Sequence, residues 1–304
     1  MLDVLRAEIM KFLKVSLYNK PVDYIIHEVD DQEEYSRMLI TYKGSDNDDI
    51  PAFLLLPKGK GPFPSVIIHH QHNGERNFGK SEVCGLVGNP LQAFGTALAK
   101  KGYVVLAPDS ICFEDRRKNC KGTILDNEND WLQHYNEMCY KIISGDSLMR
   151  KVLEDASIGV SLLYHNSLVD KARIGTLGHS YGGNTVIFLS ALDQRIKFSC
   201  SSGAACTFKT KFTEGTGIEM AEVIPGFTNY YDIEDLIKCV APRKLLIVSA
   251  TNDKYSMDAD DIELHVKDQI SNDKNHWLDH KRFLGGHPLT EERFDYILNW
   301  LDLC

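Results

Sequence analysis

Residues 178–183 place a serine among small residues at the end of an apolar run. They read Gly-His-Ser-Tyr-Gly-Gly and follow the run 172–177. A serine on a sharp strand-to-helix turn is exposed for nucleophilic attack, and flanking glycines avoid collisions with neighbouring backbone. We therefore expect Ser180 to be a catalytic nucleophile. The alternative is a glycine-rich turn that contains an incidental serine.

A serine nucleophile needs a base, because its hydroxyl is a poor nucleophile at neutral pH. His287 is the best placed of the eleven histidines. It follows the run 281–284 and the flexible pair Gly285-Gly286, and it precedes the amphipathic segment 291–301. We expect His287 to be the general base, with a surface histidine as the alternative.

The base must be oriented by an acid, which we expect between nucleophile and base at the end of a strand. Asp253 lies in the turn after the buried-looking run 244–250. The chain order Ser180, Asp253, His287 is the order used by hydrolases with a serine elbow. The alternatives to Asp253 lie further along, in an expected helix, and are Asp258, Asp260 and Asp261.

An oxyanion that forms during acyl transfer needs preorganised hydrogen-bond donors. The backbone N–H of Tyr181, directly after the nucleophile, is the first expected donor. The second is expected in the loop 70–74, after the strand 65–70. We favour the N–H of His72, with Gln71 as the alternative.

The same loop has a competing interpretation as a metal site. His70 and His72 alternate along an extended chain and point to one side, so they could share a metal ion. No carboxylate motif supplies an obvious third ligand, and a metal would crowd the oxyanion site. We therefore expect no metal and no cofactor.

Asp109, at another strand end, is expected to be a structural hydrogen-bonding residue.

Short β-rich runs alternate with longer helical stretches from residue 64 onward. This alternation predicts an α/β fold with a parallel sheet and helices on both faces. Ligands in such folds bind at the carboxyl ends of the strands, where each candidate residue above is expected. The predicted strands are 65–70, 103–107, 173–177, 196–201, 244–249 and 280–284.

The N-terminal part has a different pattern. Residues 1–20 contain an amphipathic helix, and three extended segments follow at 22–29, 35–42 and 52–56. Their close spacing predicts antiparallel strands at one edge of the sheet.

Two stretches are too long for simple crossovers, 112–170 and 204–238. The first has Trp131, Tyr135, Met138 and Ile142 at helical spacing, which predicts extra packing helices or a partial lid. The second contains aromatic residues that either line an acyl or sugar pocket or belong to the core. These aromatics are Phe208, Phe212, Phe227, Tyr230 and Tyr231.

The bulk composition is that of a globular protein, and we expect the 304 residues to form one domain, 1–304. The net charge of −9 disfavours nucleic-acid and anionic-membrane partners. No membrane span or signal peptide is expected, which makes a cytoplasmic location the default. The eight cysteines lack CxxC spacing and are expected to be reduced thiols.

The motif around Ser180, with Asp253 and His287 in order, resembles the α/β-hydrolase superfamily, most closely its dienelactone-hydrolase-like and acetyl-xylan-esterase-like branches. The segments 101–109, 169–170 and 241–246 also match, and the likeness covers about residues 50–302. It implies a mostly parallel eight-stranded sheet and an acyl-enzyme on serine. Dienelactone hydrolases proper have a cysteine nucleophile, so serine points to esterase chemistry.

The sequence thus predicts a serine carboxylesterase that acts on small acyl or acetyl esters, with a small-molecule ester as its partner. The alternatives are a peptidase or amidase with the same three residues, and a non-catalytic ligand binder on a hydrolase scaffold. The sequence leaves open whether the chain is a monomer or a homo-oligomer.

Overall fold

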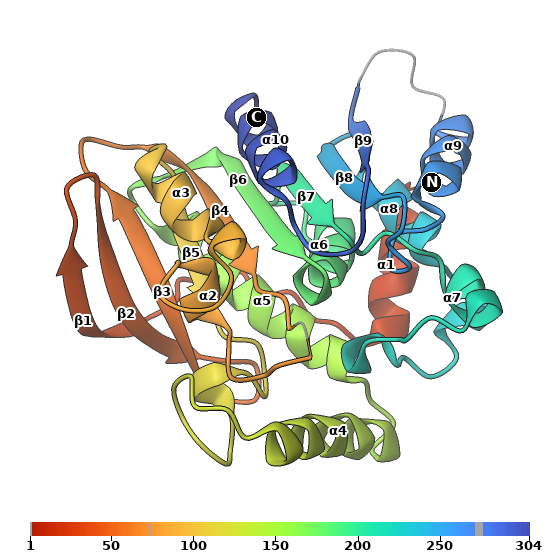
Figure 1. Cartoon of the computed structure of the whole chain (residues 1–304), viewed down its shortest axis with the longest axis horizontal. Helices are drawn as coiled ribbons and strands as arrows, with labels where there is room; N and C mark the ends of the chain where they lie inside the picture. Colours follow the sequence, from red (N-terminus) through yellow and green to blue (C-terminus); the bar gives the residue numbers. More distant parts are fainter. Residues whose placement is uncertain (1, 73, 271–275) are drawn as a thin grey trace.

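One nine-stranded sheet organises the chain in a computed structural model that describes residues 2–72, 74–270 and 276–304. The strand order is β1-β2-β3-β5-β4-β6-β7-β8-β9, and helices cover both faces (Figure 1). The α/β-hydrolase fold predicted from the resemblance is confirmed. The count of eight strands is wrong, because all three N-terminal extended segments join the ladder beside the six later strands.

The first three strands form the antiparallel edge that their spacing predicted. These strands are β1 (Tyr24–Asp31), β2 (Tyr35–Lys43) and β3 (Asp49–Pro57). Neighbours pair antiparallel, and β3 continues antiparallel onto β5 (Val104–Pro108). This outer part of the sheet leads into the parallel part that positions the site.

The other five pairings, from β5 to β9, are all parallel. Parallel strands bring their carboxyl ends to one edge, so the loops that follow them are neighbours in space. The remaining strands are β4 (Phe63–His69), β6 (Val169–His179), β7 (Phe198–Ser202), β8 (Lys244–Ala250) and β9 (Leu278–Phe283).

The two faces of the sheet bury two separate apolar clusters. In β4, Ile67 belongs to one cluster, whereas its neighbours Val66 and Ile68 belong to the other, as side-chain alternation along a strand requires. Helices α3 (Phe94–Lys100) and α10 (Glu291–Asp302) cover the second face. The first is covered by α1 (Leu2–Leu13), α5 (Leu148–His165), α6 (Tyr181–Leu192), α8 (Ile233–Val240) and α9 (Ala259–Gln269).

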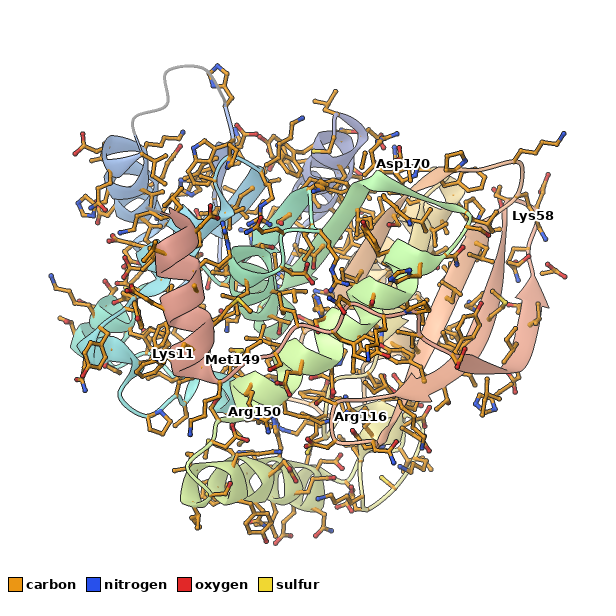
Figure 2. The ribbon with its side chains drawn as sticks, turned by 180° about the vertical axis from the view of Figure 1, so that it is seen from behind. Lys11, Lys58, Arg116, Met149, Arg150 and Asp170 are labelled. Carbon is orange, nitrogen blue, oxygen red and sulfur yellow. The ribbon has the colours of Figure 1, made fainter. Side chains whose placement is uncertain are left out.

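The view from behind shows α1 and α5 lying across the first face (Figure 2). The labelled residues Met149 and Arg150 mark the start of α5. Its fifteen buried residues occupy almost the whole helix, so α5 is the central packing element of this face.

Helix α4 (Asn127–Ile143) lies outside this packed layer and follows the expected pattern only in part: Met138 packs against the core, but the two aromatic residues do not. Trp131 and Tyr135 are 48% and 39% exposed and stack on each other with centroids 5.0 Å apart. The buried residues of α4 are Asp130 and His134. Polar contacts hold the helix, since Asp130 accepts a 2.6 Å bond from the Arg117 guanidinium.

The aromatic residues of 204–238 divide between the core and the surface. Phe208, at the start of α7 (Phe208–Glu214), and Phe227 are buried in the core cluster of the first face. Phe212 and Tyr230 are 58% and 72% exposed. None of the five aromatics lines the cavity described below, so the core interpretation fits the buried ones.

All eight cysteines are free thiols, as their spacing indicated, and five of them are buried. Among the described helices, none combines the length and the apolar character that crossing a membrane requires.

Candidate active site

The turn between β6 and α6 exposes Ser180 at a strained backbone position. Ser180 has φ 57° and ψ −121°, in a region that residues with a side chain rarely adopt. A Cβ on Gly178 would lie 2.3 Å from the carbonyl carbon of Gly182, and one on Gly182 would lie 1.9 Å from the His69 oxygen. Both glycines are therefore required by close backbone contacts, as the motif predicted.

The structure brings the three residues Ser180, His287 and Asp253 into one hydrogen-bonded chain. The His287 Nε2 lies 2.8 Å from the Ser180 Oγ, and its Nδ1 lies 3.0 Å from the Asp253 Oδ1. Because an ionised carboxylate only accepts, Nδ1 carries the proton and donates it to Asp253. Nε2 then presents its lone pair to the serine hydroxyl, which is the geometry of an activated nucleophile.

Asp253 is 2% exposed and is held by hydrogen bonds to both of its oxygens. Oδ1 also accepts from the N–H of Tyr255 at 3.0 Å, and Oδ2 accepts from the hydroxyl of Ser256 at 2.9 Å. Burial opposes ionisation, but the hydrogen bond and electrostatic interaction with His287, together with these donors, lower the pKa of Asp253 below its usual value. The carboxylate is therefore ionised at neutral pH.

Neighbouring groups that the sequence analysis did not single out fix the position of His287. Its ring stacks on His179 with centroids 4.9 Å apart, and Tyr255 meets it edge to face at 4.8 Å. Arg293, at the start of α10, donates to the carbonyls of the surrounding loop, those of Leu284, Gly286 and Pro288. His179 lay inside the motif itself, but nothing in its type distinguished it from a buried spacer.

The alternative acids lie elsewhere and are used elsewhere. Asp258 accepts a 2.5 Å bond from the Thr207 hydroxyl, and Asp260 pairs with Arg282 at 2.8 Å. Asp261 lies in α9 and is exposed. Of the four candidates, the structure places Asp253 against His287.

A cavity of about 280 Å³ opens at Ser180. Its lining combines the turn at Ser180 between β6 and α6, which we call the elbow, the loop after β4 and residues from the 204–238 stretch. The lining residues are His72, Gly74, Ser180, Tyr181, Asn184, Gly203, Lys211, Gly217, Ile218, Glu219, Glu222, Tyr255 and His287.

Two of the expected oxyanion donors border this cavity. Within the described part of the chain, the N–H groups of Tyr181 and His72 have no backbone partner. Tyr181 is the first residue of α6, where N–H groups point out of the helix end and favour negative charge. Gln71 does not line the cavity, and its side-chain amide points to the Glu82 carboxylate at 3.3 Å. Asn73 lies outside the described residues.

The ring of His72 is held at both nitrogens. Its Nδ1 accepts from the N–H of Gly74 at 2.7 Å, so Nε2 carries the proton and donates it to Glu219. Burial opposes ionisation of Glu219, but its hydrogen bond and electrostatic interaction with His72, together with His134 and Arg76 nearby, lower its pKa below the usual value. Glu219 directly precedes η3 (Met220–Glu222), and no sequence signal pointed to it.

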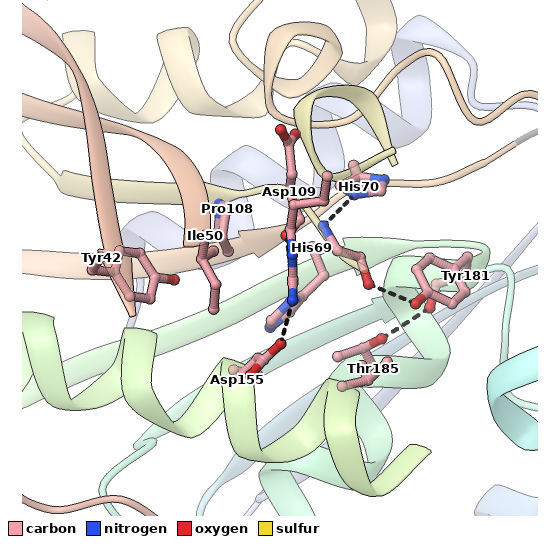
Figure 3. Close-up of a pocket in the computed structure, with 13 residues that line it drawn as sticks. Tyr42, Ile50, His69, His70, Pro108, Asp109, Asp155, Tyr181 and Thr185 are labelled. Carbon is pink, nitrogen blue, oxygen red and sulfur yellow. Dashed lines mark hydrogen bonds and ion pairs between the residues drawn. The ribbon is translucent and has the colours of Figure 1, made fainter. Parts of the chain in front are cut away.

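His70 faces a second, small cavity of about 30 Å³ beneath the elbow and not the Ser180 cavity (Figure 3). Its Nδ1 donates to the Gln71 carbonyl at 2.8 Å, and its Nε2 accepts from the N–H of Ser110 at 3.0 Å. Burial lowers the pKa of His70 to about 4, so the ring is neutral. Both ring nitrogens are engaged within the chain, and His70 and His72 face different cavities.

Asp109 belongs to a buried ion cluster behind the site. Its carboxylate lies with those of Glu114 and Asp115 in a group close enough to ligate a cation. The Lys80 ammonium occupies that position, 2.9 Å from Asp109 and 2.5 Å from each of the other two. Asp109 also accepts from the N–H of Lys80 at 2.8 Å. Its contacts are those of the structural residue that the sequence analysis expected.

The fold and the serine elbow define the class of this protein: it is an enzyme of the α/β-hydrolase fold with a serine nucleophile motif. Residues 50–201, half of the chain, match the sequence model of the dienelactone hydrolase family. The chain therefore belongs to the dienelactone hydrolase family. The matched residues include Ser180 and end before Asp253 and His287.

Similar proteins agree with this placement. The Bacillus subtilis (strain 168) protein YtaP, which is named as a hydrolase, is 26% identical over 259 residues, covering 83% of this chain and 81% of YtaP. An acetyl xylan esterase from Paenibacillus sp. R4 has a TM-score of 0.64 at 13% identity, covering 99% of this chain and 94% of that one. A glucuronoyl esterase from Solibacter usitatus has a TM-score of 0.63 at 16% identity, covering 98% and 91%. At these identities the solved structures show the shared fold.

Proposed function

We propose that this enzyme hydrolyses small acyl or acetyl esters through an acyl-enzyme on Ser180. The observation that carries the proposal is the hydrogen-bonded chain Ser180–His287–Asp253, with steps of 2.8 and 3.0 Å, which opens into the cavity. Nucleophile, base and orienting acid in one chain are the parts that acyl transfer needs. The cavity of about 280 Å³ lies at the small end of ligand sites, which favours short acyl groups.

The reaction follows from the roles of these groups. Ser180 Oγ bonds to the acyl carbon while His287 Nε2 takes the hydroxyl proton, and the carbonyl π electrons move onto oxygen. The N–H groups of Tyr181 and His72 are the proposed donors to this oxyanion. Collapse expels the alcohol, which takes the proton from His287. Water then attacks the acyl carbon while His287 takes its proton. Collapse breaks the bond between the acyl carbon and Ser180 Oγ, Oγ takes the proton back from His287, and the free acid leaves.

The test is turnover of p-nitrophenyl acetate by the wild type and by Ser180→Ala. We expect a loss of kcat on the order of 10⁴-fold or more, because the members of such a catalytic set act as a unit. Ser144→Ala, a change at an exposed serine after α4, is the matched control and should keep wild-type rates. Undiminished turnover by the Ser180 variant would contradict the proposal.

Two further measurements distinguish the alternatives. A fluorophosphonate probe should label Ser180 in the wild type, and a folded protein that is not labelled would favour a non-catalytic binder. Parallel rates on p-nitrophenyl acetate and p-nitroacetanilide compare ester with amide cleavage, and we expect the ester to be preferred. A cytoplasmic location, a single domain over 1–304 and any homo-oligomer stay predictions.

A further inference from the structure

One side of the cavity is formed by charged residues from the 204–238 stretch. We call Lys211, Glu219 and Glu222 the charged wall. Lys211, in α7, places its Nζ 2.7 and 2.9 Å from the two carboxylate oxygens of Glu222, at the end of η3. Their side chains are 2% and 1% exposed. The pair is therefore desolvated, and each charge is offset by the other.

The charge balance of the lining leaves no uncommitted cation. Among the described lining residues, Lys211 is the sole lysine or arginine, and its ammonium bonds to Glu222 alone. Glu219 adds a second carboxylate, which is bonded to His72. His287 must be neutral to act as a base. The cavity lining thus holds two carboxylates and one ammonium that is already paired. Outside the lining, the buried Arg76 guanidinium donates to the Gly74 carbonyl and to His134 and offsets part of the Glu219 charge.

We infer that the Lys211–Glu222 pair makes this site select against esters that carry a carboxylate and in favour of uncharged esters. The inference deepens the proposed function and rests on it. A carboxylate that enters the cavity loses its hydration and finds no free ammonium or guanidinium among the described lining residues to replace it. It also meets the negative charge of the charged wall at short range, where screening by water is reduced. An uncharged ester of the same size has a much smaller hydration free energy to lose and is not repelled by the charged wall.

The same arrangement predicts how the selectivity is reversed. Glu222→Gln removes the counter-charge and nearly preserves the side-chain volume, so the Lys211 ammonium becomes available to a substrate carboxylate. Hydrogen bonds to a charged group are strong enough to change affinity by about tenfold or more. The reversal must depend on Lys211, so the double variant Lys211→Met/Glu222→Gln should lose it.

The experiment compares dimethyl adipate with monomethyl adipate at pH 7, by release of methanol. The two esters share the adipoyl chain, and the monomethyl ester carries a carboxylate in place of the second methyl ester, so kcat/KM is compared per ester group. We expect wild-type kcat/KM for the monoanion to be lower than for the diester by roughly tenfold or more. Glu222→Gln should raise the ratio of monoanion to diester by roughly tenfold, and the double variant should return it to the wild-type value. Glu214→Gln, a change at an exposed carboxylate of α7, should leave the ratio unaltered.

Each outcome separates this inference from the function on which it rests. Hydrolysis of neither ester by the wild type would overturn the proposed function, and the selectivity with it. Equal kcat/KM on both esters would overturn the selectivity alone. So would an unchanged ratio in a Glu222→Gln variant whose thermal unfolding remains cooperative. If that variant does not fold, the wild-type ratio still decides the inference.

Discussion

The two sides of the cavity are built in different ways. Ser180, Asp253 and His287, which we call the triad wall, lie in loops that directly follow β6, β8 and β9. The hydrogen-bond ladder of the sheet fixes the distances between those strand ends, so the triad wall inherits its geometry from the backbone. In contrast, none of the three residues of the charged wall lies in a loop that directly follows a strand.

The charged wall is held by side chains instead. Its elements are one short helix, α7, and one turn of 3₁₀ helix, η3, which packs on α5. The ion pair Lys211–Glu222 ties α7 to η3, and the hydrogen bond that His72 donates to Glu219 ties the charged wall to the loop after β4. Damage to the triad wall should therefore affect the chemistry, whereas damage to the charged wall should affect stability and substrate choice.

The largest expected effect is on catalysis, from Asp253→Asn. The amide keeps the size of the carboxylate but favours the wrong tautomer of His287, as Asp→Asn does in the serine protease triad. We expect kcat on p-nitrophenyl acetate to fall on the order of 10⁴-fold, with a melting temperature close to that of the wild type. A loss below tenfold would show that the His287–Asp253 contact does not orient the base.

The next effect is on folding, from Lys211→Met. The change leaves the Glu222 carboxylate, 1% exposed, without its counter-charge. Removing one partner of a buried ion pair costs roughly 3–5 kcal/mol in the free energy of unfolding. Urea unfolding measures this loss, and Lys209→Met, at an exposed lysine of the same helix, should stay within about 0.5 kcal/mol of the wild type. Equal stability of the two variants would mean that the ion pair does not support the charged wall.

Glu219→Ala tests the point where the two walls meet. It frees the His72 ring from its acceptor and loosens the loop whose N–H we propose as an oxyanion donor. Since removal of one such donor costs roughly 10²–10³ in kcat, a displaced donor should cost about 10 to 100-fold, with KM little changed. Glu219→Gln should recover most of the rate, because its amide oxygen still accepts from Nε2. A loss confined to KM would instead place Glu219 in substrate binding.

The smallest effect is the pH dependence of stability at Asp253. Its pKa is lowered in the folded chain, so its stabilising contribution is present above the unfolded value of about 4 and is lost as the pH falls through the folded pKa. We expect the difference in melting temperature between the wild type and Asp253→Asn to be constant from pH 7 to 5 and to shift against the wild type by pH 3.5. A difference that is independent of pH would show that the carboxylate is not stabilised by its partners.

The residues of the triad wall could be predicted from the sequence because each is marked by the few residues around it. Gly178 and Gly182 mark close backbone contacts, and Ser180, Asp253 and His287 each follow a β-rich run by a few residues. The antiparallel edge and the parallel run of strands were readable for the same reason, since residue patterns of period two and the turns between them are short-range features. The count of eight strands came from family likeness and was wrong by one.

Other features depend on contacts between distant segments. The spacing of apolar residues in α4 suggested one packing face, and Met138 does pack on the core. Trp131 is nevertheless 48% exposed, whereas His134 is buried because Arg76 and Phe113 from other segments contact it. Periodicity along one helix cannot show which of its faces meets the rest of the chain.

The sequence by itself determined an α/β fold with a parallel sheet and the candidate triad, because strand ends, glycine contacts and chain order are encoded over a few residues each; the resemblance to a known family then implied the α/β-hydrolase fold. Only the tertiary structure decided that Lys211 pairs with Glu222 and that Glu219 binds His72, from 147 residues away. Such pairings depend on where the stretch 204–238 lies relative to the strand ends. The energy of an ion pair depends on the distance between its two charges in space, and the order of residues in the chain does not give that distance.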